Sequence, residues 1–312
     1  MPSVRKCFIH VGTHKTGTTS IQHLLSRNSS ALRERGYFYP QAGRPDLLSG
    51  HHNLAWEISG DHRFRNNYGS IDDLIREVRY RSDHIILSSE DFVCALDNKA
   101  KFSDFILLLQ SSGFLVTVTL YVRNQIDYLP RAYLTFLESG GDLSWSDWPF
   151  LNADYCVLLR RIRENANVDV IVRSYDHART SVCRDFLSIL NLTPRDLHLD
   201  GEVRVNASRS LREYLLIFLQ NRPGTKLLEN EEAVLNTLVS PETKQIRLSP
   251  ALSVDLFHRF RSTNRNLFLQ YGIPEPKMEA TFEQDCPDTP YVDELFSEST
   301  EVYIRNYSKD ER

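Results

Sequence analysis

The stretch "HVGTHKTGTTSIQHLL", from His10 to Leu25, decides how this chain folds. An apolar run, "CFIHV", leads into it, and the residues after its second glycine are apolar at helical spacing. A strand, a turn and a helix in this order aim backbone N–H groups at one point, at the helix N-terminus. Both the geometry and the helix dipole make that point a binding site for an anion.

The turn contains the residue types that an anion site needs. Gly12 permits a close approach of the backbone to a ligand, and Lys15 adds a full positive charge. Hydroxyl residues surround the lysine in greater number than a simple helix cap requires. We expect the anion to be bound by Gly12, His14, Lys15, Thr16, Gly17, Thr18, Thr19 and Ser20.

Short β-branched runs alternate with helical patterns along the rest of the chain. This alternation predicts an α/β fold with a mainly parallel central sheet flanked by helices, similar to that of the P-loop NTPases. The predicted strands are Cys7–Val11, His84–Ser89, Phe114–Val122 and Val168–Tyr175. The predicted helices after the first are Asp104–Gln110, Ile126–Glu138, Tyr155–Glu164, Thr180–Leu190, Leu211–Gln220 and Ser253–Tyr271.

Length and composition predict one α/β domain over residues 1–273, followed by an acidic extension over residues 274–312. Residues 222–248 are polar and weakly periodic, which suggests a lid or a substrate-facing insertion. The net charge of -4 argues against a nucleic-acid partner. Five scattered cysteines and the lack of a long apolar run predict a cytoplasmic protein without a membrane segment.

The position of the lysine distinguishes between two kinds of phosphate loop. Gly12 and Gly17 have the spacing of the Walker pattern G-x-x-x-x-G-K-[ST], but Thr18 occupies the lysine position. Lys15 lies inside the loop instead, so a nucleoside triphosphate would lose its usual charged partner. A P-loop kinase or nucleotide hydrolase is therefore the weaker alternative.

Two motifs resemble those of the sulfotransferases that use 3′-phosphoadenosine 5′-phosphosulfate (PAPS). "GTHKTGTTSIQ" resembles their 5′-phosphosulfate loop, G-x-x-[KR]-[ST]-G-[ST]-[ST]. "LYVRNQIDYLPRAYLTF" resembles their second element, R-[DN]-P-x-D-x-x-x-S-x-[YF], with Arg123, Asn124, Asp127 and Tyr133 in the matching places. Weaker similarities, such as "HHNLAWEI" and "ILSSEDF", extend the resemblance over roughly residues 6 to 272.

The resemblance implies a PAPS donor, a 3′-phosphoadenosine 5′-phosphate (PAP) product and no metal. Lys15 is then expected to stabilise the leaving oxygen, and Arg123 to hold the 3′-phosphate. Arg131 stands where the family has a phosphate-binding serine, and its charge can replace that hydroxyl. Asn206 and Ser208 are expected in a loop that closes over the nucleotide, or alternatively as the cap of the next helix.

A sulfotransferase also needs a base for its acceptor, which the resemblance implies is a hydroxyl or amine of a carbohydrate, lipid or small metabolite. His51, His52 and Glu90 are the candidates, and the sequence does not choose among them. The aromatic residues Tyr133, Trp145 and Trp148 are expected either in the core or at the ligand site, where they would stack on an adenine or line the acceptor cleft. A catalytically inactive nucleotide-binding module remains a further alternative because of Arg131.

Overall fold

The computed structural model describes residues 4–149, 153–164, 168–197, 209–222, 235, 238–240, 243–275 and 289–300. The chain divides into two compact units, each assembled from three segments. Unit 1 comprises Met1–Arg123, Asp154–Val205 and Leu267–Pro274, and unit 2 comprises Asn124–Ala153, Asn206–Asn266 and Glu275–Arg312.

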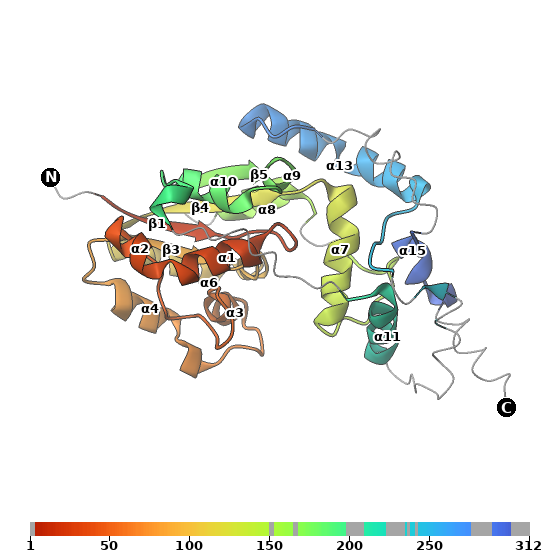
Figure 1. Cartoon of the computed structure of the whole chain (residues 1–312), viewed down its shortest axis with the longest axis horizontal. Helices are drawn as coiled ribbons and strands as arrows, with labels where there is room; N and C mark the ends of the chain where they lie inside the picture. Colours follow the sequence, from red (N-terminus) through yellow and green to blue (C-terminus); the bar gives the residue numbers. More distant parts are fainter. Residues whose placement is uncertain are drawn as a thin grey trace. The chain divides into compact units, whose positions relative to one another are not determined.

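A five-stranded, all-parallel sheet forms the centre of unit 1, in the order β2-β3-β1-β4-β5 (Figure 1). The strands are β1 (Arg5–His10), β2 (Tyr37–Phe38), β3 (His84–Ser88), β4 (Phe114–Val122) and β5 (Asp169–Ser174). The central strands are apolar on both faces, as strands of a sheet covered on both sides must be.

Helices cover both faces of this sheet. Ile9 and Leu87 belong to a core cluster with residues of α3, α4, α5, α6 and α8, whereas Phe8 and Ile86 pack with residues of α1, α2, α9 and α10. Neighbouring strand residues therefore bury against opposite helical layers. The helices are α1 (Thr18–Arg27), α2 (Ser29–Glu34), α3 (His52–Ser59), α4 (Ile71–Val78), α5 (Phe92–Ala95), α6 (Lys99–Ser111), α8 (Tyr155–Glu164), α9 (Tyr175–Ala178) and α10 (Val182–Ile189).

Unit 2 has a helical core of its own. Its elements include α7 (Gln125–Glu138), α11 (Leu211–Asn221), α15 (Val292–Leu295) and α13 (Pro250–Tyr271), whose last turns belong to unit 1. The fully buried Tyr133 packs edge-on against Trp145, Trp148 and Phe296, with ring centroids 5.3 to 5.4 Å apart. These aromatic residues are therefore core residues, the first of the two roles that the sequence allowed.

The predicted fold class is confirmed, and the sheet is consistent with that of P-loop NTPases. Strand β2 was not predicted, because two residues are too short to show an alternating pattern. The segment from residue 274 onward was predicted to be an acidic extension. Its described part contributes the buried residues Val292, Leu295 and Phe296 to the core of unit 2.

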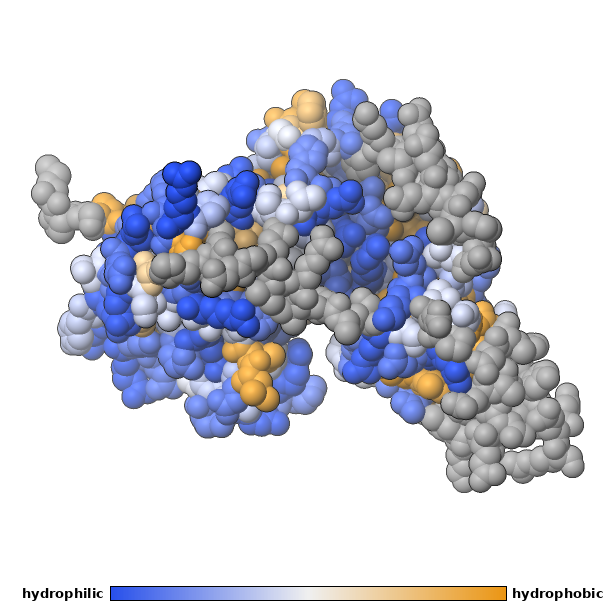
Figure 2. Space-filling view, in the orientation of Figure 1, coloured by the Kyte–Doolittle hydropathy of each residue, from blue (hydrophilic) through white to orange (hydrophobic). Residues whose placement is uncertain are grey.

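The face of the molecule drawn in Figure 2 is predominantly polar where its residues are coloured. Figure 2 shows a mostly hydrophilic face on which apolar residues occur in small, separate patches. Among the residues that the structure describes, no helix combines the length and apolar character needed to cross a lipid bilayer.

Candidate functional site: a glycine-rich loop beside buried histidines

The loop between β1 and α1 is a tight turn. Gly12, Lys15 and Gly17 have positive φ angles of 45°, 62° and 78°, the left-handed region that glycine tolerates best. A Cβ on Gly12 would lie 2.4 Å from the Thr18 Cγ2 methyl, so the loop has no room for a side chain there. Gly17 is the N-cap of α1 and supplies no side-chain cap.

The loop leaves a set of backbone donors open. In the described part of the chain, no N–H group from Gly12 to Ser20 donates a hydrogen bond to a protein acceptor. The first turn of α1 contains no acidic residue that would compete for the positive end of the helix dipole. An anion bound in this loop would therefore satisfy donors that the protein itself leaves free.

Only some of the predicted hydroxyl contacts remain available to a ligand. The buried Thr16 hydroxyl donates to the Thr13 carbonyl at 2.6 Å, so it shapes the loop from inside. Thr18 is also buried, with its methyl group beneath Gly12. His14, Lys15, Gly17, Thr19 and Ser20 are partly exposed.

Two cations meet at this loop. Arg123, directly after β4, donates from Nη1 to the Lys15 carbonyl oxygen at 3.0 Å. Its Nε is buried and makes no hydrogen bond to the described residues, and Asp176 lies 3.9 Å away. The Lys15 ammonium has no carboxylate partner in the described structure, so its positive charge remains available to an anion.

His51 is held by the backbone on both sides of its ring. Nε2 lies 3.0 Å from the Pro40 carbonyl oxygen, and Nδ1 accepts the Ser88 N–H at 3.1 Å. Burial, together with the positive charge of Arg44, lowers the pKa of His51 to about 3. This histidine is neutral near pH 7, and neither ring nitrogen is left to receive a substrate proton.

His52, at the start of α3, has one nitrogen engaged by side chains. Nδ1 lies 3.1 Å from Asp91 Oδ2 and 3.0 Å from Ser89 Oγ. Burial alone would lower the pKa of His52, but the hydrogen bond to Asp91 and the charges of Glu90 and Asp91 raise it above its ordinary value. The structure therefore separates the two adjacent histidines into different environments.

Glu90, the third candidate base, is bound to the loop helix. Gln22 of α1 donates from Nε2 to Glu90 Oε2 at 2.8 Å. This bond connects α1 with the turn after β3, the neighbour of β1 in the sheet. The candidate base residues and the loop therefore lie at the same end of the sheet, at the carboxyl ends of its parallel strands.

Two polar residues beneath the loop were not predicted. His10, completely buried at the end of β1, has Nδ1 2.8 Å from Ser88 Oγ, while its Nε2 makes no hydrogen bond to the described residues. Burial lowers the pKa of His10 to about 4, against an opposing effect of Glu90. The only sequence signal for His10 is its position at the end of an apolar strand. Asp91 was missed as well, because it follows the more prominent Glu90.

The remaining predicted donor residues are Arg131, Asn206 and Ser208. Arg131 belongs to unit 2, where its Nη1 donates to the Asp127 carbonyl oxygen one turn earlier in α7, at 2.7 Å. Asn206 and Ser208 lie outside the described residues. Within the described ranges, no group of three or more histidine, cysteine or acidic side chains has the arrangement of a metal site.

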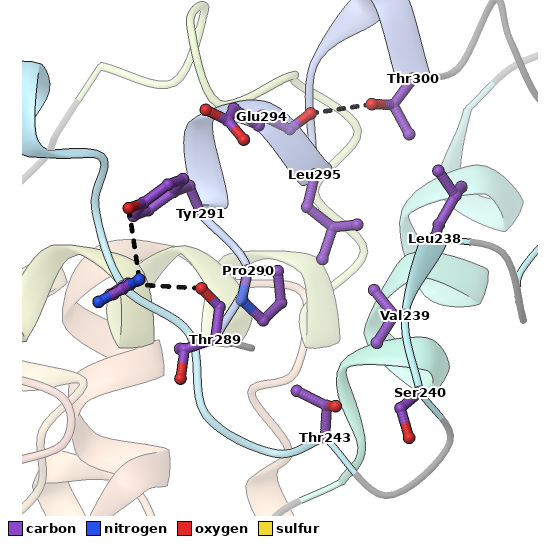
Figure 3. Close-up of a pocket in the computed structure, with 11 residues that line it drawn as sticks. Leu238, Val239, Ser240, Thr243, Thr289, Pro290, Tyr291, Glu294, Leu295 and Thr300 are labelled. Carbon is purple, nitrogen blue, oxygen red and sulfur yellow. Dashed lines mark hydrogen bonds between the residues drawn. The ribbon is translucent and has the colours of Figure 1, made fainter. Parts of the chain in front are cut away.

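Unit 2 contains a cavity of about 600 Å³ (Figure 3). Arg247 lies at its edge, donating to the Thr289 carbonyl at 3.3 Å and to the Tyr291 hydroxyl at 3.3 Å. Part of the predicted insertion, residues 222–248, therefore lines a cavity together with the chain around α15. The other lining residues are Leu238, Val239, Ser240, Thr243, Pro290, Glu294, Leu295 and Thr300.

No protein-family model matches this chain, and no curated protein shows significant similarity to it.

Proposed function

We propose that this chain is a PAPS-dependent sulfotransferase. The observation that carries the proposal is the loop itself, with open backbone donors from Gly12 to Ser20 and a lysine at position 15. Thr18, at the Walker lysine position, is buried and uncharged, which argues against a loop built for a triphosphate. Arg123, whose buried Nε makes no hydrogen bond to the described residues, adds a second cationic group beside the loop.

Sulfuryl transfer resembles phosphoryl transfer, in which the protein mainly positions the groups and neutralises developing charge. The loop N–H groups would hold the 5′-phosphate, and Arg123 the 3′-phosphate. As the S–O bond breaks, its electron pair goes to the 5′-phosphate oxygen of PAP. The Lys15 ammonium would stabilise that charge, as oxyanion donors do in acyl transfer.

The acceptor that fits this scheme is a hydroxyl or amine of a carbohydrate, lipid or small metabolite. Arg131 is proposed to supply further charge for the 3′-phosphate, and Asn206 and Ser208 to close over the nucleotide. These assignments rest on the resemblance of the two motifs to the PAPS-binding elements of the sulfotransferases. Cytoplasmic PAPS would be the donor, and no metal takes part in the scheme.

Calorimetric titration with PAP and ATP, each with and without Mg²⁺, tests the proposed donor. We expect PAP to bind without metal and more tightly than ATP. Tighter binding of ATP that requires Mg²⁺ would contradict the proposal and favour the kinase or hydrolase alternative. PAP binding without release of PAP from PAPS, in the presence of hydroxyl and amine acceptors, would indicate an inactive binding module.

A further inference from the structure

The hydrogen bond between His52 and Asp91 joins two elements at the edge of the sheet. His52 is the first residue of α3, and Asp91 lies in the turn that follows β3. Their Nδ1 and Oδ2 atoms are 3.1 Å apart, and both residues are buried. An ionised carboxylate can only accept, so this bond requires the proton of a neutral His52 to be on Nδ1.

Neighbouring groups hold Asp91 in this orientation. The Trp56 indole N–H, one turn further along α3, donates to the same Oδ2 atom at 2.8 Å. The Trp56 ring also stacks on the His52 ring, with centroids 5.9 Å apart and an interplanar angle of 30°. Asp91 N–H donates to Ser89 Oγ at 3.1 Å, so both ends of the residue are anchored.

The other ring nitrogen of His52 lies close to Gly50, as does the Gln22 side chain of the loop helix. A Cβ on Gly50 would lie 2.8 Å from His52 Nε2 and 2.7 Å from Gln22 Nε2, so both side chains border the space above this glycine. Gln22 in turn is bonded to Glu90. Unlike His51, whose ring is held from both sides by backbone groups, His52 has Nε2 without a protein partner among the described residues.

We propose that Asp91 is a positioning residue that orients His52 as the base for the acceptor. This inference rests on the proposed sulfotransferase function. The acceptor proton passes to His52 Nε2 while the acceptor atom bonds to sulfur, and the S–O electron pair leaves with PAP. His52 afterwards releases the proton to solvent. Asp91 stays ionised and stabilises the imidazolium that forms, as the aspartate of a catalytic triad does.

Histidine ¹⁵N NMR of the whole chain tests the positioning without requiring activity. In the wild-type protein we expect the neutral His52 ring to be protonated on Nδ1. Asp91→Asn should lower the pKa of His52, because it removes the negative charge that raises it. Asp97→Asn, a nearby exposed carboxylate paired with Arg161, is the matched control and should change neither property. A wild-type ring protonated on Nε2 would overturn the positioning role.

The rate of PAP release from PAPS tests whether His52, oriented by Asp91, acts as the base. Asp91→Asn should reduce kcat by up to about 10⁴-fold, the loss caused by the same change in a catalytic triad, with little change in the KM for PAPS. It should also move the acidic limb of the pH–rate profile to lower pH, which a purely structural change would not do. Asp91→Glu, which keeps the charge, should keep the limb near its wild-type position. His52→Ala should lose most activity and still bind PAP.

Three results separate the failure of this inference from the failure of the proposed function. Normal turnover by His52→Ala together with an inactive Glu90→Gln would make the carboxylate the base. An unchanged pH limb in Asp91→Asn would show that Asp91 does not act through His52. A wild-type protein that neither binds PAP nor consumes PAPS would refute the proposed function and the base role together, whatever the NMR shows of the hydrogen bond.

Discussion

At the scale of single residues, Lys15 is the clearest test of the proposed chemistry. Lys15→Ala should reduce PAP release from PAPS by about 10²–10³-fold, because its charge is needed most in the transition state. The thermal unfolding temperature should change little, since the ammonium makes no ion pair within the described structure. Lys99→Ala, which breaks a surface ion pair with Glu164, is the control. Near-normal turnover by Lys15→Ala would remove this lysine from the mechanism.

Arg123 contacts the loop and is also the proposed 3′-phosphate ligand. If Arg123 binds the 3′-phosphate, Arg123→Ala should weaken PAP binding by roughly 1.5–3 kcal/mol. The same substitution should barely change the binding of 5′-AMP, which lacks the 3′-phosphate. Calorimetry with both nucleotides measures the difference. Equal losses would show that Arg123 acts through its hydrogen bond to the Lys15 carbonyl oxygen. Arg173→Ala, on neighbouring β5, is a control for the loss of a partly buried arginine.

The arginine at position 131 departs from the sulfotransferase motif, which has a serine there. Arg131→Ser restores the residue that the resembled family has at this position. We expect PAP affinity to stay close to the wild-type value if charge and hydroxyl serve equally well. A large gain or loss measured by calorimetry would show that the two residues are not equivalent.

At the scale of elements, the turn between β1 and α1 depends on the absence of one side chain. Gly12→Ala places a Cβ 2.4 Å from a Thr18 carbon, so the loop or the first turn of α1 must move. We expect it to weaken PAP binding and to cost more stability than Gly36→Ala. Gly36 also has a positive φ, of 77°, but a Cβ there meets nothing within 4 Å.

The comparison of these two glycines separates backbone strain from steric contact. Gly36→Ala should cost only about 1–2 kcal/mol, the energy of a left-handed alanine, and should leave PAP affinity unchanged. Urea unfolding and PAP titration of both variants provide the measurement. Equal PAP affinities for the two variants would indicate that the loop tolerates a Cβ and that its shape is not required for binding.

At the scale of the whole molecule, the buried histidines predict how stability depends on pH. The pKa of His51 is lowered to about 3 and that of His10 to about 4, both mainly by burial. As pH falls below about 6.5, the unfolded chain binds protons that the folded protein does not bind, so stability is lost. Each residue should cost about 2 kcal/mol at pH 5 relative to pH 7.

Urea unfolding at pH 7 and pH 5 tests this dependence. His52 has the opposite effect, because its pKa is raised in the folded protein. Its contribution to stability is fully present below the pKa of the unfolded chain and is lost as pH rises through the pKa of the folded protein. The difference between a variant and the wild type therefore isolates the effect of a single histidine on the pH dependence. His51→Gln should lose about 2 kcal/mol less than the wild type between the two pH values. His62→Gln, an exposed histidine, should behave as the wild type does, and equal losses in all three proteins would contradict the prediction.

The sequence by itself determined the elements whose patterns are local. The ranges predicted for β4 and α8, Phe114–Val122 and Tyr155–Glu164, agree with the structure at both ends, and α1 begins directly after Gly17. Alternating apolar runs and helical spacing depend on neighbours within a few residues, so a single sequence contains them. The same holds for the turn at Gly12 and Gly17, whose residue types imply their backbone angles.

The contacts of each candidate side chain depend on how distant segments of the chain pack together. His51 and His52 are adjacent in sequence, yet the first is held by the backbone at Pro40 and Ser88 and the second by the carboxylate of Asp91. These partners come from segments 11 to 39 positions away. Hydrogen bonding and burial set the pKa of a histidine, and both arise only when distant segments pack together. For that physical reason the sequence could propose both histidines, and only the folded chain could distinguish them.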